Sequence, residues 1–195
     1  MTAKAPPHPY EPISYWDWRA PSYRPPELGR LGEQLVIWMG EYGIAANHVL
    51  EVGSGNGRIY KLVMNDSFGI EYGINYMMVD VAPEMAGQCQ RNTGEPVMLW
   101  DGITLPYMDN TFDWVISFSV LLHVPPADIA QHVAELARVS RRFVFVSTYT
   151  SVQSFTFGHC FRHNYDQLFK DAGLSVVDKR RFEREKQTQW LLKKT

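Results

Sequence analysis

Three glycines in a five-residue stretch are the clearest chemical signal in the sequence. Gly53, Gly55 and Gly57 follow the acid Glu51 and a short apolar segment at 48–52. Glycine permits positive φ and lets the backbone approach a ligand closely. A loop of this kind, between the carboxyl end of a strand and the start of a helix, is typical of a site for a nucleotide-like ligand. A tight turn that binds nothing is the alternative interpretation.

The spacing of the glycines separates two ligand classes. A dinucleotide fingerprint, G-x-G-x-x-G, would need its third glycine at position 58, where the sequence has Arg58. The observed spacing is G-x-G-x-G with an acid two residues earlier, and it resembles the first motif of class I S-adenosylmethionine (SAM)-dependent methyltransferases. The resemblance implies a SAM-binding loop, and a nucleotide-dependent oxidoreductase is the disfavoured alternative. The predicted cofactor contacts in this loop are Glu51, Gly53, Ser54, Gly55 and Gly57.

Two further acids follow in register with the loop. Asp80 ends the apolar segment 75–80, where a carboxylate can accept both hydroxyls of a ribose. The stretch 78–85 is similar to the second motif of the same family, which adds Val81 to the predicted contacts. The stretch 100–115, WDGITLPYMDNTFDWV, is similar to the family's D-A-x-x-L-P-F-x-D-x-S-F-D-x-V segment. The resemblance implies that Asp101 binds the adenine amine, that Gly102 and Ile103 flank the ring, and that Ser117 also contacts the cofactor.

Methyl transfer from a sulfonium is an in-line displacement, so the protein must mainly hold nucleophile, methyl and sulfur on one line. A hydroxyl acceptor additionally needs a base. His123 follows the apolar segment 112–119, and His159 lies between two later elements. We predict both as catalytic or substrate-contacting residues. Bracing of the neighbouring helix or loop is the alternative for each.

The remaining acceptor contacts are predicted from residue type and position. The spacing His159-Cys160-x-x-His163 could suggest a metal, but a tetrahedral site needs further ligands and none lies nearby in the sequence, so no metal is expected. The aromatic and basic residues near the expected pocket could wall or clamp an acceptor. The predicted substrate contacts are Trp16, Trp18, Tyr149, Arg162 and His163.

Strand-like and helix-like segments alternate along the sequence, and these elements must position the residues named above. An amphipathic helix is expected at 27–42 because apolar residues recur every three or four positions. The pattern predicts an α/β fold, a three-layer Rossmann-like sandwich with helices on both faces of a seven-stranded, mostly parallel sheet. The last strand is antiparallel because only a short turn precedes it. The strands are expected at 48–52, 75–80, 96–100, 112–119, 142–148, 174–181 and 187–193, with helices at 58–64, 83–91, 126–139 and 165–172.

The chain divides into two parts. Residues 1–26 form an arm rich in proline and aromatic residues, and 27–195 form the predicted SAM-dependent methyltransferase domain. Disordered tails are poor in aromatics, so the arm is expected to pack on the body, over the site, from residue 13 onward. The resemblance is to small-molecule members, of the ubiquinone/menaquinone-biosynthesis type.

Composition limits the partners. The 195 residues carry a formal net charge of −2, which provides no basic field for nucleic acid. The longest apolar stretch, 114–124, is too short to span a bilayer, and two distant cysteines favour a reducing, cytoplasmic compartment. The segment SFSV at 117–120 lacks the motif of nucleobase amino-methyltransferases. We therefore expect a small-molecule acceptor, with SAM as donor and S-adenosylhomocysteine (SAH) as product. The alternatives are a SAM- or SAH-binding protein without turnover and a protein-directed methyltransferase.

Overall fold

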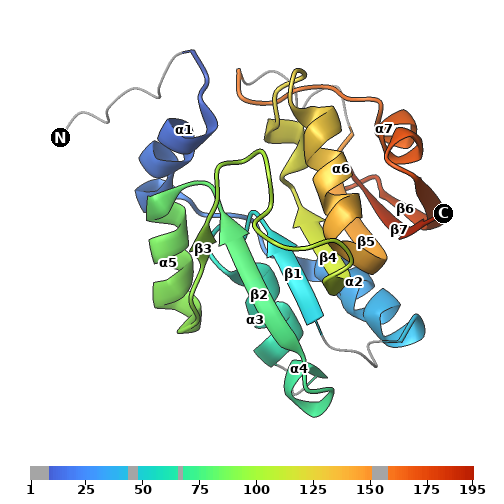
Figure 1. The fold of residues 1–195 in the computed structure, drawn as a ribbon. Helices are drawn as coiled ribbons and strands as arrows, with labels where there is room; N and C mark the ends of the chain where they lie inside the picture. Colours follow the sequence, from blue (N-terminus) through green and yellow to red (C-terminus); the bar gives the residue numbers. More distant parts are fainter. Residues whose placement is uncertain (1–8, 44–47, 66–67, 151–157) are drawn as a thin grey trace.

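The structure is a computed structural model that describes residues 9–43, 48–65, 68–150 and 158–195. A twisted sheet runs through the centre of this part, in the order β3-β2-β1-β4-β5-β7-β6 (Figure 1). β1 pairs in parallel with β2 and β4, whereas β7 lies antiparallel between β5 and β6. The predicted α/β sheet with one antiparallel last strand is therefore confirmed. The strands are β1 (His48–Val52), β2 (Asn75–Asp80), β3 (Met98–Leu99), β4 (Phe112–Phe118), β5 (Ser140–Tyr149), β6 (Leu174–Phe182) and β7 (Gln187–Lys194).

Helices cover both faces of the sheet, as predicted. Apolar side chains of α2 and α3 pack with one face, around the buried Trp38 and Trp114. Those of α6 and α7 pack with the other, around Leu136 and Phe169. The α-helices are α1 (Pro12–Arg19), α2 (Gly29–Glu41), α3 (Arg58–Asn65), α4 (Phe68–Glu71), α5 (Pro83–Thr93), α6 (Ile129–Val139) and α7 (Tyr165–Asp171). No helix in the described ranges is long and apolar enough to cross a membrane.

Two predicted element boundaries are wrong. The strand expected at 96–100 is reduced to β3, because only Met98 and Leu99 pair with β2. The helix expected at 126–139 begins at Ile129, because the amides of Asp128 and Ile129 both donate to the carbonyl of Pro125 and close a turn first. This turn is significant for the site, since it leaves 124–128 as a loop rather than helix.

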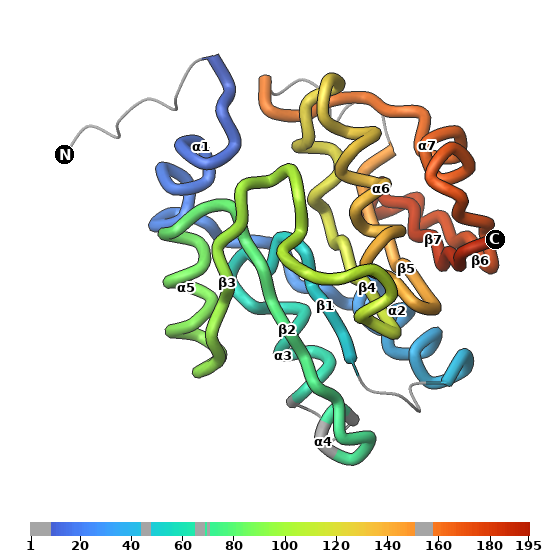
Figure 2. The backbone as a smooth tube through the Cα atoms, in the orientation of Figure 1, coloured from blue at the N-terminus to red at the C-terminus, as the bar shows by residue number. Residues whose placement is uncertain are grey.

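The N-terminal segment lies against the body through α1. It packs beside α5, near the end of the sheet where β1 and β2 finish (Figure 2). Ala20, Ala82 and Met85 form a small buried cluster there, with Trp16 and Tyr23 packed against it. Asp17 Oδ1 accepts a hydrogen bond of 2.8 Å from the amide of Glu84 in the first turn of α5. Ala82, the N-cap residue of α5, makes no side-chain cap hydrogen bond, so Asp17 of the arm caps this helix instead.

Candidate functional site

A cavity of about 280 Å³ lies at the carboxyl ends of the parallel strands. Its walls come from the arm, the glycine loop after β1, the segments after β2 and β3, the loop after β4 and the start of α6. Ligands of open parallel sheets bind at this edge, where the direction of strand order reverses between β1 and β4. The chemistry-bearing residues are described below from the loop outward.

The glycine loop is shaped by positive φ at all three glycines, 77° at Gly53, 57° at Gly55 and 83° at Gly57. The backbone amide of Gly53 donates to the carbonyl of Val79, which ties the loop to β2. A Cβ at Gly53 would lie 2.4 Å from Cγ2 of Val120, so this glycine allows the loop to approach the segment after β4. Both Gly53 and Gly55 line the cavity.

Gly57 and Ser54 do not line the cavity, and their predicted role as cofactor contacts stays a prediction. A Cβ at Gly57 would lie 2.5 Å from Cγ2 of Thr93 and 3.0 Å from Sγ of Cys89. Gly57 is therefore needed so that the loop can pack on α5. Ser54 is buried beneath the loop, with 3% of its surface exposed.

Asp80 lies at the carboxyl end of β2 and lines the cavity together with Val81. Its Oδ2 accepts from the amide of Gly55 at 2.8 Å, and Oδ1 accepts from the amide of Ala82 at 3.0 Å. Burial raises the pKa of Asp80 to about 6, against the opposing effect of these backbone hydrogen bonds. The carboxylate holds the loop in place and also presents an acceptor to the cavity.

Glu51 is buried and does not line the cavity, and its predicted cofactor contact stays a prediction. It is 1% exposed and its Oε2 accepts a hydrogen bond of 3.0 Å from the hydroxyl of Tyr76 in β2. Burial raises the pKa of Glu51 to about 8, so the carboxyl is mainly protonated at neutral pH. Ser117 is fully buried within β4 and is not among the lining residues of the cavity, and its predicted cofactor contact stays a prediction.

Asp101 shapes the segment after β3. Its Oδ1 accepts from the amides of Ile103 at 2.8 Å and Thr104 at 2.9 Å, and these backbone donors hold its pKa below the usual range. The resulting turn places Gly102 and Ile103 at the cavity with Asp101 itself.

Residues that the sequence did not single out complete this end of the cavity. Trp100 and His132, whose rings lie edge to face at 5.4 Å, both line it. Burial lowers the pKa of His132 to about 4, so its imidazole is neutral at physiological pH. Met85, Phe118 and Tyr23 add apolar surface. Of these, Met85 and Trp100 lie within the motif-like stretches 78–85 and 100–115, and Phe118 directly follows the predicted Ser117.

The chain turns sharply after β4. Ser119 has φ of 59°, a left-handed conformation that is uncommon for a residue with a side chain. Its amide donates to the carbonyl of Ser147 at 2.7 Å, which holds it in place. Such backbone strain gathers at functional sites. Here it redirects the chain so that Ser119, Val120 and His123 all face the cavity.

His123 is fixed from three directions. Its Nδ1 lies 2.9 Å from the backbone carbonyl oxygen of His159, and the ring of Trp16 packs edge-on at 4.8 Å. The hydroxyl of Tyr10 donates to the carbonyl of His123 at 3.1 Å. Burial lowers the pKa of His123 to about 4. A neutral ring whose Nδ1–H donates to a carbonyl has a lone pair on Nε2, and Nε2 has no partner in the described part of the chain.

His159 stacks on His123 and does not line the cavity, and its predicted catalytic role stays a prediction. Its ring stacks on Tyr15 at 4.4 Å, and its Nε2 lies 3.2 Å from the Tyr15 hydroxyl. His123, His159 and Cys160 each present a potential ligand atom within 4.8 Å of the others. However, Nδ1 of His123 is engaged with a carbonyl, and the two imidazole planes differ by only 18°, so their lone pairs do not converge on one point.

The other predicted acceptor contacts divide into two groups. Trp16 lines the cavity, whereas Trp18, Tyr149, Arg162 and His163 are not among its lining residues. Trp18 packs against the ring of Tyr15 at 5.6 Å, and Nε2 of His163 lies 3.0 Å from the carbonyl of Val124. His163 therefore braces the loop that carries His123. Tyr10, which does line the cavity, was missed because nothing in the sequence indicates its contact with a residue 113 positions away.

The comparisons with known proteins agree with this geometry. Residues 50–143 match the family model of a methyltransferase domain. This match covers the glycine loop, Asp80, Asp101 and His123. None of the curated proteins matches the sequence.

Several solved structures share the fold. Magnesium protoporphyrin IX methyltransferase from Synechocystis PCC 6803, with bound SAH, has a TM-score of 0.68 at 18% identity and covers 85% of this chain and 83% of its own. A SAM-dependent methyltransferase from Aquifex aeolicus has a TM-score of 0.67 at 16% identity, with 84% and 89% covered. The [4+2]-cyclase SpnF has a TM-score of 0.63 at 15% identity, with 83% and 80% covered. At these identities the likeness shows the fold alone.

Proposed function

We propose that this chain, which is a SAM-dependent methyltransferase of the class I Rossmann-like fold, methylates a small molecule bound beneath its N-terminal arm. The observation that carries the proposal is the single cavity that joins the glycine loop and Asp80 to His123 and Trp16. A donor site and an acceptor site that share one enclosed space are what an in-line methyl transfer requires. The ubiquinone/menaquinone type of acceptor stays a prediction.

The donor half of the cavity fits SAM in the residues it offers. We propose that Asp80 accepts hydrogen bonds from the ribose hydroxyls and that Asp101, Gly102 and Ile103 contact the adenine, because all four residues line the cavity. Only the ring of Tyr23 comes within 4.0 Å of where a Cβ of Gly55 would lie, so the loop leaves room for a ligand against its backbone. When bound, SAM supplies a methyl group already activated by its sulfonium charge, and loss of that methyl group leaves SAH.

The acceptor half lies between the arm and the loop after β4. Tyr10, Trp16 and Phe118 offer flat apolar walls, and Nε2 of His123 offers a hydrogen-bond acceptor. His123 would hold an N–H or O–H of the acceptor and so orient the reacting atom toward the donor. His159 acts in this account through its carbonyl, as a positioning residue. We propose the same division for the chain as a whole, with an arm at 1–26 and a catalytic domain at 27–195. Of the arm, the described residues Tyr10 and Trp16 contribute to the acceptor half of the cavity.

Two other functions stay as alternatives. A protein-directed methyltransferase is disfavoured because residues of α1 and Tyr10 form part of the cavity wall, which makes a small molecule the better fit. A SAM-binding protein without methyl transfer is favoured by one finding, the cyclase activity of a protein with this fold. Fold therefore does not determine the reaction here.

The test has two stages. Calorimetry with SAH should give saturable binding to the purified protein. Release of SAH from SAM is then measured against mixtures of small amines, phenols and carboxylic acids, with a peptide mixture in parallel. We expect release with at least one small-molecule mixture. Release with peptides only, or binding of SAH without release from any mixture, would contradict the proposal.

A further inference from the structure

The charges around the cavity are all of one sign. Four carboxylates, those of Glu11, Asp80, Asp101 and Asp128, are among its lining residues. No lysine or arginine is found among the lining residues that the structure describes. An acceptor with a carboxylate or phosphate group would therefore meet like charge and find no cationic clamp.

Two arginines contact aromatic rings of the cavity wall without lining the cavity themselves. The guanidinium of Arg58 lies 5.2 Å from the centre of the Phe118 ring, and that of Arg19 lies 5.8 Å from the centre of the Tyr23 ring. Tyr23 faces Gly55 of the glycine loop. Neither arginine is among the lining residues of the cavity, so neither forms a cationic clamp at its surface.

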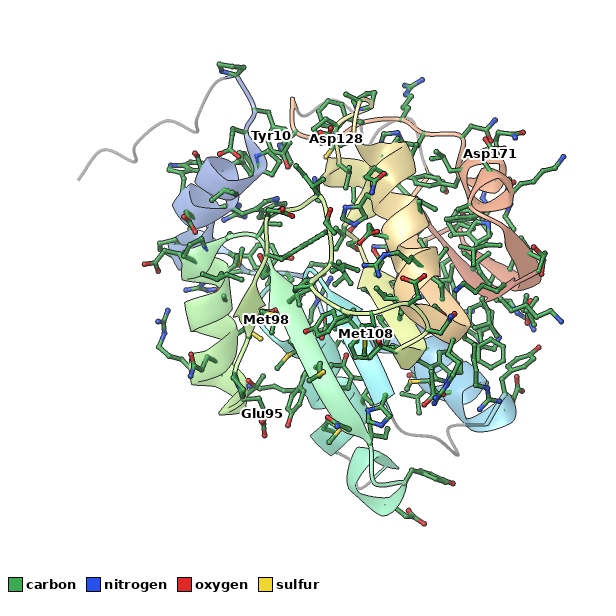
Figure 3. All side chains as sticks on the ribbon, in the orientation of Figure 1. Tyr10, Glu95, Met98, Met108, Asp128 and Asp171 are labelled. Carbon is green, nitrogen blue, oxygen red and sulfur yellow. The ribbon has the colours of Figure 1, made fainter. Side chains whose placement is uncertain are left out.

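Of the four lining carboxylates, only that of Asp128 has no other role in the described part of the chain. Glu11 caps α1 by accepting from the amides of Ile13 and Ser14, and Asp80 and Asp101 hold backbone amides of the donor site. Asp128 occupies the N-cap position of α6, but its φ of −109° and ψ of −15° differ from an extended cap and its side chain makes no cap hydrogen bond. Its carboxylate therefore remains available at the rim of the cavity. Figure 3 shows Asp128 and Tyr10 at the same end of the molecule.

The weak base at the site also favours amine acceptors over hydroxyl acceptors. A hydroxyl must transfer its proton to a base, and the low pKa of the His123 imidazole, about 4, makes it a weak one. An amine that binds as an ammonium first gives one proton to water, and the neutral amine then attacks the methyl carbon with its lone pair while the methyl–sulfur bond breaks and SAH leaves. The aromatic walls of Tyr10 and Trp16 in addition attract an ammonium group through their π faces.

We infer that the acceptor is an amine on an apolar or aromatic skeleton, recognised by the aromatic walls and by the carboxylate of Asp128. This inference rests on the proposed function, because it names the substrate class of the same cavity. It excludes carboxylic acids and phosphate esters as substrates.

Three isosteric compounds test the inference on the SAH-loaded protein. Phenethylamine, 2-phenylethanol and 3-phenylpropionate differ mainly in charge, and their affinities can be measured by ligand-observed NMR. We expect the amine to bind roughly fivefold or more tightly than the acid, the scale of a partly exposed charge interaction. Asp128→Asn should remove most of this preference. Glu33→Gln, which changes an exposed carboxylate on α2, is the matched control and should preserve it.

Several results would overturn the inference. They are equal or tighter binding of the acid or the alcohol, an unchanged preference in Asp128→Asn, and no binding of any of the three compounds. SAH binding is measured first by calorimetry, so a failure of the proposed donor site is recognised separately. If the protein binds SAH but prefers 3-phenylpropionate, the proposed function stands and the inference of an amine acceptor is wrong.

Discussion

Nδ1 of His123 lies 2.9 Å from the backbone carbonyl oxygen of His159, and this contact fixes the orientation of the one imidazole that faces the acceptor end of the cavity. A carbonyl can only accept, so Nδ1 carries the proton and Nε2 carries the lone pair. The predicted pair of catalytic histidines thus separates into one residue that meets the acceptor and one that positions it.

Replacement of His123 tests this division. His123→Ala should lower kcat/KM for the acceptor by roughly 10- to 100-fold, the size expected when a reacting group loses its orientation. The affinity for SAH should change by no more than about twofold, because the donor is held by other residues. Steady-state SAH release and calorimetry measure the two quantities. His48→Asn, an exposed histidine at the start of β1, is the control. Equal losses of SAH affinity and of kcat/KM in His123→Ala would argue against an acceptor role.

Asp80 gives the donor site a pH dependence. Its pKa is raised to about 6, and the carboxylate form is the one that accepts hydrogen bonds from a ribose. The affinity for SAH should therefore weaken as the pH falls from 7 to 5. In Asp80→Asn the affinity should be lower by roughly tenfold or more at pH 7, the cost of a lost charge-assisted hydrogen bond, and it should stay flat over this range. A wild-type affinity that is constant between pH 5 and 7 would contradict this assignment.

Glu51 should affect stability rather than binding. Its pKa in the folded protein, about 8, lies above the ordinary value of 4.5, so the folded state retains a proton that the unfolded state loses. The associated stability is fully present below pH 4.5 and is lost as the pH rises through 8. Glu51→Gln, which keeps the shape without the charge, should exceed the wild type in unfolding free energy by about 1–3 kcal/mol at pH 9 and match it at pH 4.

Chemical denaturation at the two pH values measures this difference, and Glu33→Gln serves as the exposed control. SAH affinity should be unaffected in Glu51→Gln at pH 7, because Glu51 does not line the cavity. A large loss of SAH affinity would restore the sequence-based interpretation of Glu51 as a cofactor contact.

The elements that carry strong local patterns could be predicted from the sequence. The glycine spacing, the acid at Asp80 and the alternation of strands with helices depend on short stretches of chain, and each agrees with the structure. The roles of Gly57 and Glu51 could not be predicted, because they depend on what Thr93 and Tyr76 bring against them from elsewhere in the chain.

The acceptor half was the least predictable part. Tyr10 and His123 meet across 113 positions, and His132 lines the cavity from within α6, where no signal in the sequence indicated it. Aromatic residues in a proline-rich arm indicated packing on the body, but sequence alone could not distinguish Trp16, which lines the cavity, from Trp18, which does not. Two residues apart on one helix, they point in different directions.

The arm is attached through Asp17. Asp17→Ala removes the acceptor for the Glu84 amide and should lower the unfolding free energy by about 1 kcal/mol, the usual value of a lost N-terminal cap. Hydrogen exchange of the amides in 10–23 should accelerate, and SAH should dissociate faster because α1 covers its site. Asp17→Asn, which retains a side-chain oxygen, should show smaller changes in all three. Unchanged exchange and dissociation in Asp17→Ala would mean that α1 does not depend on this contact.

A crystal structure of the protein with SAH bound tests the central claim most directly. We predict that the ribose hydroxyls contact Asp80, that the adenine lies beside Asp101 and Ile103, and that the sulfur points toward His123 beneath Tyr10 and Trp16. SAH bound outside this cavity, or within it with the sulfur directed away from His123, would contradict the account.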